Sequence, residues 1–292
     1  MDAPSENGPV VALPESLLVI AGWGLLPRLV LEGARAAGVR RLCVLGFRGS
    51  CSRSLRPLCD RFERIPLGSL ELFLARARAA ECAHVALAGQ IHPMSLLHAR
   101  FDAAARAELA RMPVRNAHTA FGRIVELLGE AGMEALPVSP FLAGHLPGAG
   151  LLTRGAPDER VARDIRYGLS VARAVGDADV GQTVVVKDGV VMAVEAIEGT
   201  NAAIDRGARL AGCGAVVAKG AKAGHDMRFD IPVVGLRTMA LLRRRRVAAL
   251  GLQAGRVILL ERDALLEFAD RHGIVVEAVE SGLPHAPALA AR

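Results

Sequence analysis

The residues best able to do chemistry lie in one loop that follows the apolar segment Val216-Val217-Ala218 and ends at Pro232. The charged side chains of this loop are Lys219, Lys222, His225, Asp226, Arg228 and Asp230. Cationic side chains neutralise phosphate oxygens, and carboxylates hold a hard divalent cation or orient water. The loop therefore predicts a site for a phosphate ester and a metal ion. A solvated, charged turn is the alternative interpretation.

Two glycine-containing turns could contact an anion through main-chain N–H groups. The first, Gly22-Trp23-Gly24, follows a predicted strand over 17–21 and precedes a helix that starts near Pro27. The dinucleotide fingerprint needs a glycine where Pro27 stands, and it needs an acid after the second strand, which ends instead in Gly46-Phe47-Arg48. This disfavours an NAD-dependent oxidoreductase. A nucleotide or sugar-phosphate contact and a simple packing turn both remain open.

The second turn, Gly199-Thr200, lies between a predicted strand over 190–196 and a predicted helix over 202–210. With Glu198 and Asn201 beside it, the turn could hold a ligand, or Thr200 could be a helix cap and nothing more. The chain has neither a G-x-S-x-G motif nor a P-loop, which disfavours acyl transfer and ordinary ATPase chemistry.

The elements that must position these turns alternate between strands and helices, which predicts an α/β fold of two domains. We expect a disordered leader over 1–15, an N-terminal Rossmann-like domain with a parallel sheet over 16–145, and a C-terminal mixed α/β catalytic domain over 146–285. The glycine- and proline-rich segment 140–150 is the expected linker. A helix is expected over 238–250.

Composition narrows the class of protein. The chain has 292 residues, of which 52% are hydrophobic, yet no uncharged apolar run reaches the roughly 18 residues of a membrane span. The first ten residues lack the pattern of a signal peptide, so we expect a cytoplasmic protein. The five cysteines form no C-x-x-C pair, which argues against a zinc ribbon and a disulfide framework.

The formal charge of +6 favours anionic partners. With one Trp, one Tyr and no nucleic-acid motif, we expect no nucleic acid among them. The run of arginines at 243–246 lies within the predicted helix over 238–250. Such a run can lie on an anionic inner-membrane surface, or it can be a solvated helix face.

The second half of the chain resembles the LpxI-type UDP-2,3-diacylglucosamine pyrophosphatases of lipid A biosynthesis. The matching segments are DVGQ (179–182), GVVMAVEAIEGT (189–200), VAK (217–219) and MRFDIPVVG (227–235). The N-terminal segment IAGWGLLP (20–27) resembles the family's Ala-Gly-Gly-Gly-x-x-Pro opening, with Trp23 in place of a glycine.

The resemblance implies hydrolysis of a UDP-linked acylated sugar, UDP-2,3-diacylglucosamine, to UMP and 2,3-diacylglucosamine 1-phosphate, with Mg²⁺ or Mn²⁺. It implies that the substrate is held by both domains and that the essential aspartate is Asp230, as metal ligand or as the residue that orients water. We expect Lys219 and Arg228 to act beside Asp230 by offsetting charge on the diphosphate. The expected substrate-binding residues are Gly22, Gly24, Leu25, Gln182, Glu198, Gly199, Thr200, Asn201 and Lys222.

One departure from the family leaves alternatives open. Where the family carries an acidic Gly-Asp-Asp segment, this chain reads Arg115-Asn116-Ala117-His118-Thr119. The alternatives are a non-catalytic nucleotide-sugar or lipid-binding protein of the same fold, and a hydrolase of a different nucleotide-linked sugar. The sequence also leaves a homodimer open.

Overall fold

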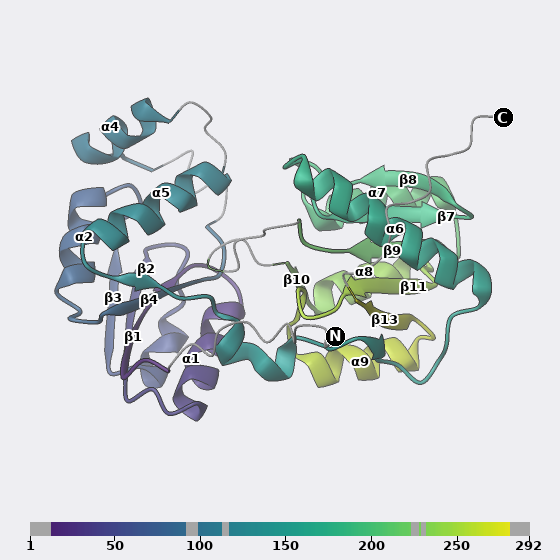
Figure 1. Ribbon diagram of the computed structural model, residues 1–292, viewed down its shortest axis with the longest axis horizontal. Helices are drawn as coiled ribbons and strands as arrows, with labels where there is room; N and C mark the ends of the chain where they lie inside the picture. Colours follow the sequence, from purple (N-terminus) through teal and green to yellow (C-terminus); the bar gives the residue numbers. More distant parts are fainter. Residues whose placement is uncertain (1–12, 92–98, 113–116, 223–227, 229–231, 281–292) are drawn as a thin grey trace, which may run out of the picture. The chain divides into compact units, whose positions relative to one another are not determined.

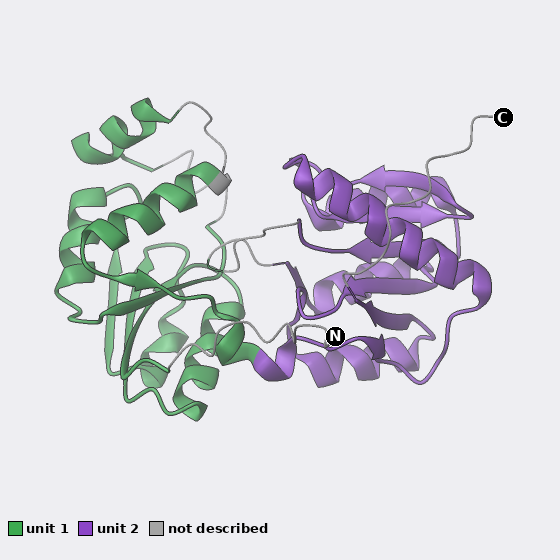
Figure 2. Ribbon diagram, viewed as in Figure 1, with its two compact units in different colours: residues 1–142, 227–229 green, residues 143–226, 230–292 purple. Residues whose placement is uncertain are grey.

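The computed structural model describes residues 13–91, 99–112, 117–222, 228 and 232–280 (Figure 1). Most of the predicted leader therefore lies outside the described residues. The chain divides into two compact units (Figure 2): unit 1 comprises residues 1–142 and 227–229, and unit 2 comprises residues 143–226 and 230–292. None of the described helices is long and apolar enough to cross a membrane.

Unit 1 is built on a five-stranded sheet in the order β3-β2-β1-β4-β5. Its described elements are β1 (Ser16–Ala21), α1 (Leu26–Ala36), β2 (Arg41–Phe47), the 3₁₀ helix η1 (Arg53–Leu58), β3 (Arg61–Ile65), α2 (Leu70–Arg78), β4 (His84–Ala88), α4 (Ala103–Arg111), α5 (Ala117–Glu130), β5 (Glu134–Ala135) and η2 (Ser139–His145), whose last residues belong to unit 2.

All neighbouring strands of this sheet are parallel, which confirms the predicted N-terminal parallel sheet. Strand β1 is a continuous apolar run with Leu17 and Val19 fully buried, as expected for a strand covered on both faces. On one face, Leu18 and Ile20 pack with Phe73 of α2 and with α5. Strand β3 was not predicted from the sequence. Its charged residues suit a strand at the edge of the sheet, but they interrupt the apolar pattern by which a buried strand is recognised.

Unit 2 is built on a six-stranded sheet in the order β6-β13-β11-β9-β7-β8, with a separate pair β10-β12. Its elements are β6 (Gly150–Leu151), α6 (Glu159–Asp177), β7 (Thr183–Lys187), β8 (Val190–Val194), α7 (Thr200–Ala211), β9 (Val216–Lys219), β10 (Val233–Val234), α8 (Leu236–Arg244), β11 (Ala249–Gln253), β12 (Ile258–Leu259), α9 (Arg262–Arg271) and β13 (Val275–Val279).

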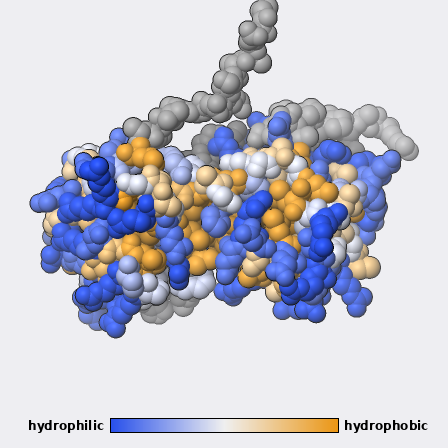
Figure 3. Space-filling model, turned by 90° about the horizontal axis from the view of Figure 1, so that it is seen from below, coloured by the Kyte–Doolittle hydropathy of each residue, from blue (hydrophilic) through white to orange (hydrophobic). Residues whose placement is uncertain are grey.

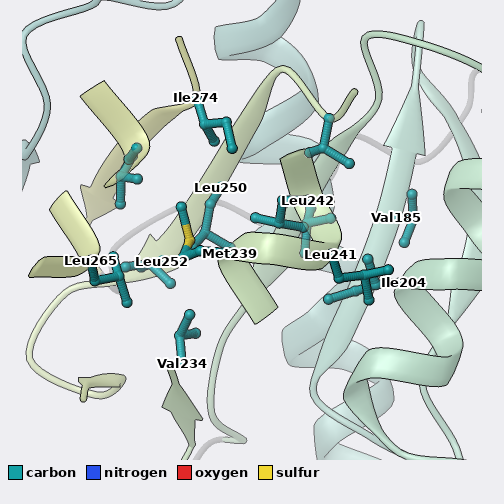
Figure 4. Packing of buried hydrophobic residues seen from close by; sticks show 14 of the residues in the cluster. Val185, Ile204, Val234, Met239, Leu241, Leu242, Leu250, Leu252, Leu265 and Ile274 are labelled. Atoms are coloured by element: carbon teal, nitrogen blue, oxygen red, sulfur yellow. The ribbon is translucent and has the colours of Figure 1, made fainter. Parts of the chain in front are cut away.

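This sheet is mixed, as the predicted C-terminal mixed α/β domain requires. Strands β9, β11 and β13 are parallel, whereas β7 runs antiparallel to both β8 and β9. Helix α6 packs Ile165 and Leu169 onto one face of the sheet. Ile204 of α7, Met239 of α8 and Leu265 of α9 belong to a second cluster, which also contains the inward side chains of β7, β9 and β11 (Figure 4).

The helix expected over 238–250 was wrong in its second half. Helix α8 ends at Arg244, Arg246 takes a left-handed conformation (φ 52°), and Ala249–Gln253 is strand β11. This strand lies inside the sheet, and its apolar run is buried on both faces. A short apolar run of this kind does not distinguish a buried strand from a buried helix by its periodicity.

Candidate functional site

The candidate site of unit 2 lies at one edge of its sheet. Strands β8 and β9 both run antiparallel to β7, so their carboxyl ends, Val194 and Lys219, lie beside the start of β7 at Thr183. Strand β11 runs parallel to β9 and ends at the same edge. Helices α7 and α8 carry the chain away from this edge, so both begin there. In open α/β sheets, ligands bind outside the carboxyl ends of the parallel strands.

Three polar residues lie side by side across β9, β7 and the end of β8. Lys219 is directly opposite Thr183. The Glu195 N–H donates to the Thr183 carbonyl oxygen at 2.8 Å. Side chains directly opposite each other share a face of the sheet. This is the face that α7 covers, because a Cβ placed on Gly207 of α7 would lie 2.7 Å from the Cβ of Val185 and 2.8 Å from that of Ala193.

The three side chains join Thr200, the first residue of α7, in one buried network. Lys219 Nζ donates to Thr183 Oγ1 at 3.1 Å and to Thr200 Oγ1 at 2.8 Å. Thr200 Oγ1 in turn donates to Glu195 Oε1 at 2.7 Å, and Lys219 Nζ lies 3.9 Å from Glu195 Oε2. Lys219 is only 2% exposed and Glu195 only 8%. The ammonium and the carboxylate thus balance each other's charge inside the fold.

This network limits what two predicted site residues can offer a ligand. A threonine hydroxyl has one proton, and Thr200 gives its proton to Glu195. Thr200 can therefore donate to a ligand only through its main-chain N–H. Lys219 is buried beneath the first turn of α7, so it would act on a ligand there through its positive charge.

The first turn of α7 carries no side-chain cap. Its N-cap residue, Gly199, has φ 81°, a conformation that favours glycine, and its carbonyl oxygen accepts from the Ala203 N–H at 3.1 Å. The N–H groups of the first turn have no partner within a helix, and the helix dipole makes this end positive. An uncapped turn of this kind suits a phosphate group.

A second helix begins beside it. Thr238, in the first turn of α8, donates its hydroxyl proton to Asn201 Oδ1 at 3.0 Å, which joins the first turns of α7 and α8. The N-cap of α8 is Gly235, again without a side-chain cap. Two positive helix ends therefore adjoin at this edge of the sheet. The same bond fixes the Asn201 oxygen, so its amide N–H₂ is the part that can bind a ligand.

The charged loop leaves β9 from an anchored start. The Gly220 N–H donates to the Gln182 carbonyl oxygen at 3.0 Å, and the Ala221 N–H donates to Gln253 Oε1 at 2.7 Å. Lys222 Nζ donates to Asp179 Oδ1 at 3.0 Å. These bonds bring Gln182 and Lys222 to the same edge of the sheet as Lys219.

Other predicted residues of the loop fall where the structure gives less detail. Asp230 and His225 lie outside the described residues, as do the side chains of residues 115–118. Arg228 is half-buried and groups with unit 1. In the part of the chain that is described, no three His, Cys, Asp or Glu side chains come together as a metal site.

Glu198 braces the turn that precedes α7. Its Oε1 accepts from the Arg206 guanidinium at 2.6 Å and its Oε2 accepts from the Ala196 N–H at 3.2 Å. The hydrogen bond from Arg206 holds the pKa of this carboxyl below its ordinary value, with main-chain N–H groups adding to the effect. Glu198 is therefore ionised near neutral pH, and it directly precedes Gly199, the N-cap residue of α7.

In unit 1, the predicted residues Gly22, Gly24 and Leu25 follow β1. The Gly22 N–H donates to the Ala88 carbonyl oxygen at 2.8 Å, and the Trp23 N–H donates to that of Gln90 at 2.6 Å. A Cβ on Gly22 would lie 2.6 Å from the Gln90 carbonyl oxygen, so only glycine fits there.

The turn lies where the order of the strands reverses. Strand β1 has β2 on one side and β4 on the other, and nucleotides bind at such points in related sheets. Leu25 is the N-cap of α1 and provides no side-chain cap. Trp23 is 50% exposed at this turn.

Sequence reasoning missed two members of the buried network, Glu195 and Thr183. Both lie at strand ends, and only the register of β7 against β8 and β9 brings them to Lys219. An acid that ends an apolar strand, three residues before Glu198, was the signal that could have identified Glu195.

Comparison with known proteins covers nearly the whole chain. Residues 16–145 match the LpxI N-terminal domain, and residues 148–277 match the LpxI C-terminal domain. The chain is also 29% identical over 275 residues to the UDP-2,3-diacylglucosamine pyrophosphatase LpxI of Caulobacter vibrioides, an alignment that covers 90% of this chain and 96% of the relative. Because the matches to the two LpxI domains together cover most of the sequence, the chain belongs to the LpxI family.

Proposed function

We propose that this protein hydrolyses the pyrophosphate bond of UDP-2,3-diacylglucosamine, giving UMP and 2,3-diacylglucosamine 1-phosphate in lipid A biosynthesis. The proposal is supported by the alignment with the Caulobacter relative, whose name states this substrate. In the structure, the observation that supports it most is the uncapped first turn of α7, which lies directly over the buried ammonium of Lys219. Main-chain N–H groups, a helix dipole and a fixed cation together suit a diphosphate.

Different residues at this edge of the sheet would bind different parts of the substrate. The N–H groups of the α7 turn at Gly199 and Thr200 would hold phosphate oxygens, with Lys219 adding charge from beneath. Hydrolysis builds negative charge on these oxygens, so positioned cations accelerate it. In unit 2, the residues we propose to contact the sugar nucleotide are Gln182, Glu198 and Asn201. For unit 1, taken by itself, we propose that the turn with Gly22, Gly24 and Leu25 can contact a nucleotide. Lys222 and Arg228 would offset further charge on the diphosphate.

The proposed catalytic carboxylate is Asp230. It would orient the attacking water or hold Mg²⁺ or Mn²⁺, a role that rests on the family motif at 227–235. Mg²⁺ is commonly bound through one or two carboxylates together with substrate phosphates, so a complete cage of protein ligands is not required. When bound, the cation would neutralise charge on the phosphate oxygens.

The test is a panel of substrates. Purified protein is incubated with Mg²⁺ and UDP-2,3-diacylglucosamine, UDP-N-acetylglucosamine or UDP-glucose, and UMP is measured by chromatography. We expect UMP from the diacylated substrate alone, and no UMP when EDTA replaces Mg²⁺. Release of UMP only from a simple UDP-sugar would support a hydrolase of a different sugar, the alternative that the departure at residues 115–119 leaves open. Binding without UMP release would support a non-catalytic protein.

For location we propose a cytoplasmic protein with an arginine-rich face toward the inner membrane. Arg209, Arg244 and Arg245 all pair with Asp205, at 3.1, 3.4 and 2.7 Å, so one carboxylate faces three guanidinium groups. Leu210, beside Arg209, is 68% exposed. Figure 3 shows one face of the protein, on which apolar patches alternate with hydrophilic side chains.

Vesicle sedimentation tests the membrane contact. We expect the protein to sediment with vesicles containing about one third phosphatidylglycerol and not with pure phosphatidylcholine, because several basic groups add their attraction to an anionic surface. Equal sedimentation with both lipids, or with neither, contradicts the proposal. Light scattering coupled to gel filtration would show whether the chain forms a homodimer.

A further inference from the structure

Glu195 is a buried carboxylate to which the proposed reaction gives no role. Its Oε1 accepts the Thr200 hydroxyl proton at 2.7 Å, whereas its Oε2 has no hydrogen-bond partner among the described residues. The Lys219 ammonium lies 3.9 Å from Oε2, which is close enough for an ion pair and too far for a hydrogen bond. The side chain therefore makes one strong contact, and its other oxygen is balanced only by charge.

Stability of the fold does not require such an arrangement. Taking two charges out of water is unfavourable, and well-packed apolar side chains of similar volume often replace a buried ion pair without loss of stability. A buried carboxylate oxygen without a hydrogen bond adds to the cost. The neighbouring positions on the same face, Val185 and Ala193, are apolar. An ion pair that is unfavourable for folding and lies directly beneath a helix start is better explained by what that helix start must do.

We propose that Glu195 is a positioning residue for the anion site at the first turn of α7. Its carboxylate takes the only hydroxyl proton of Thr200 and fixes the Lys219 ammonium beneath the turn. The ligand then meets the main-chain N–H groups of the turn, with a cation held behind them. The class of ligand is a nucleotide phosphate or diphosphate, and this identity rests on the proposed function.

The contacts explain how Glu195 acts through its neighbours. Thr200 accepts from Lys219 and donates to Glu195, so the hydroxyl cannot rotate without losing a bond. Lys219 is held from β7 by Thr183 at 3.1 Å. Removing the charge of Glu195 takes away the carboxylate that faces the Lys219 ammonium at 3.9 Å, so the ammonium is held less firmly beneath the turn. This changes the potential at the N-terminus of α7.

A double-mutant cycle tests this coupling. The variants are Glu195→Gln, Lys219→Met and the two together, each compared with the wild type for KM, kcat, UMP affinity by calorimetry, and Tm. Each single variant removes one member of the buried pair and leaves the other, so Tm falls in each. The double variant removes both members, so Tm recovers. We expect KM and the UMP Kd to rise about tenfold in each single variant and to stay about tenfold higher in the double variant, because Glu195 acts through Lys219.

The outcomes separate positioning from simple structural support. Recovery of KM together with Tm in the double variant would mean that the pair only stabilises the fold, and the proposal would be overturned. Effects that multiply to about a hundredfold in the double variant, or an unchanged KM in Glu195→Gln, would also overturn it. If a single variant does not fold, the UMP Kd of the double variant is the test. A raised Kd supports the proposal, and a Kd equal to that of the wild type overturns it.

A second buried carboxylate of unit 2 provides the matched control. Asp164 is 2% exposed and accepts the main-chain N–H groups of Asp188 and Gly189 at 2.9 and 2.8 Å. These residues form the hairpin turn at the opposite end of β7 and β8. Asp164→Asn should lower Tm and leave KM unchanged. A change in KM equal to that of Glu195→Gln would show that KM follows stability alone, which overturns the proposal.

The UMP measurement keeps this inference distinct from the proposed function. If the wild type binds UMP but releases none from UDP-2,3-diacylglucosamine, the proposed function fails and the cycle is read from the UMP Kd. If the wild type does not bind UMP, the anion site itself fails, and the inference fails with it.

Discussion

Replacing Gly207 of α7 with alanine tests how closely α7 must lie on the sheet. The added methyl carbon would lie 2.7 Å from Val185 Cβ and 2.8 Å from Ala193 Cβ. Carbon atoms pack best at about 3.5–4.0 Å, so the helix must move outward by roughly 1 Å. Alanine favours the helix over glycine by about 1 kcal/mol, whereas overpacking costs about 1–3 kcal/mol. We therefore expect a net loss of about 0–2 kcal/mol.

The matched control is Gly129→Ala in α5 of unit 1. Gly129 is exposed, and a Cβ there would meet no heavy atom within 4 Å. With no overpacking, this variant should gain about 0.5–1 kcal/mol, so the same chemical change should have opposite signs at the two positions. Urea unfolding of both variants measures the difference.

The outward movement of α7 in Gly207→Ala should also affect substrate binding. The first turn of α7 lies over Lys219, so a helix moved by roughly 1 Å should weaken the anion site and raise KM several-fold. Gly129→Ala should leave KM unchanged. If Gly207→Ala is as stabilising as Gly129→Ala and its KM is that of the wild type, α7 does not lie against β7 and β8 as described, and the reasoning is refuted.

Three further predictions concern other side chains. Trp23 is the chain's only tryptophan, so if its turn binds the nucleotide, UMP should change the intrinsic fluorescence; an unchanged signal at saturating UMP contradicts binding there. Burial raises the pKa of the Cys51 thiol from its usual 9.0 to about 11, so the stabilisation from keeping it neutral is complete below pH 9 and is lost as pH rises toward 11. Urea unfolding at pH 8 and pH 10 should show this loss in the wild type and less of it in Cys51→Ala. Cys213 is exposed, whereas Cys43, Cys51 and Cys82 are buried, so a thiol reagent should label Cys213 fastest in the native protein and Cys213→Ser should remove that fast phase.

The fold could be predicted where local pattern and tertiary position agree. Strands β1 and β4 are apolar runs bounded by turns, and the alternation with α1 and α2 predicts a parallel sheet. The apolar pattern gave the wrong prediction for β11. Its buried run follows α8 after a short turn, so the predicted helix extends into it. The pattern also failed for β3, whose charged residues reflect an edge position that the sequence does not reveal.

In the candidate site, too, the sequence could indicate some residues and not others. Gly199 and Thr200 could be identified because a glycine at a strand-to-helix junction has a local meaning. The role of Lys219 could not be read in full, because its burial and its pairing with Glu195 depend on strand register. A lysine that appears in sequence to belong to a solvated loop is the last residue of a buried strand.

We propose that this chain cleaves a nucleotide-linked diphosphate with Asp230 as its essential carboxylate. The most direct measurement is UMP release from UDP-2,3-diacylglucosamine by wild type, Asp230→Asn and Asp226→Asn, the last being a matched change four residues earlier on the same loop. With all three folded to the same Tm, we predict that UMP release falls at least a hundredfold, about 2.7 kcal/mol, in Asp230→Asn and changes little in Asp226→Asn. Equal UMP release by Asp230→Asn and the wild type would contradict the claim.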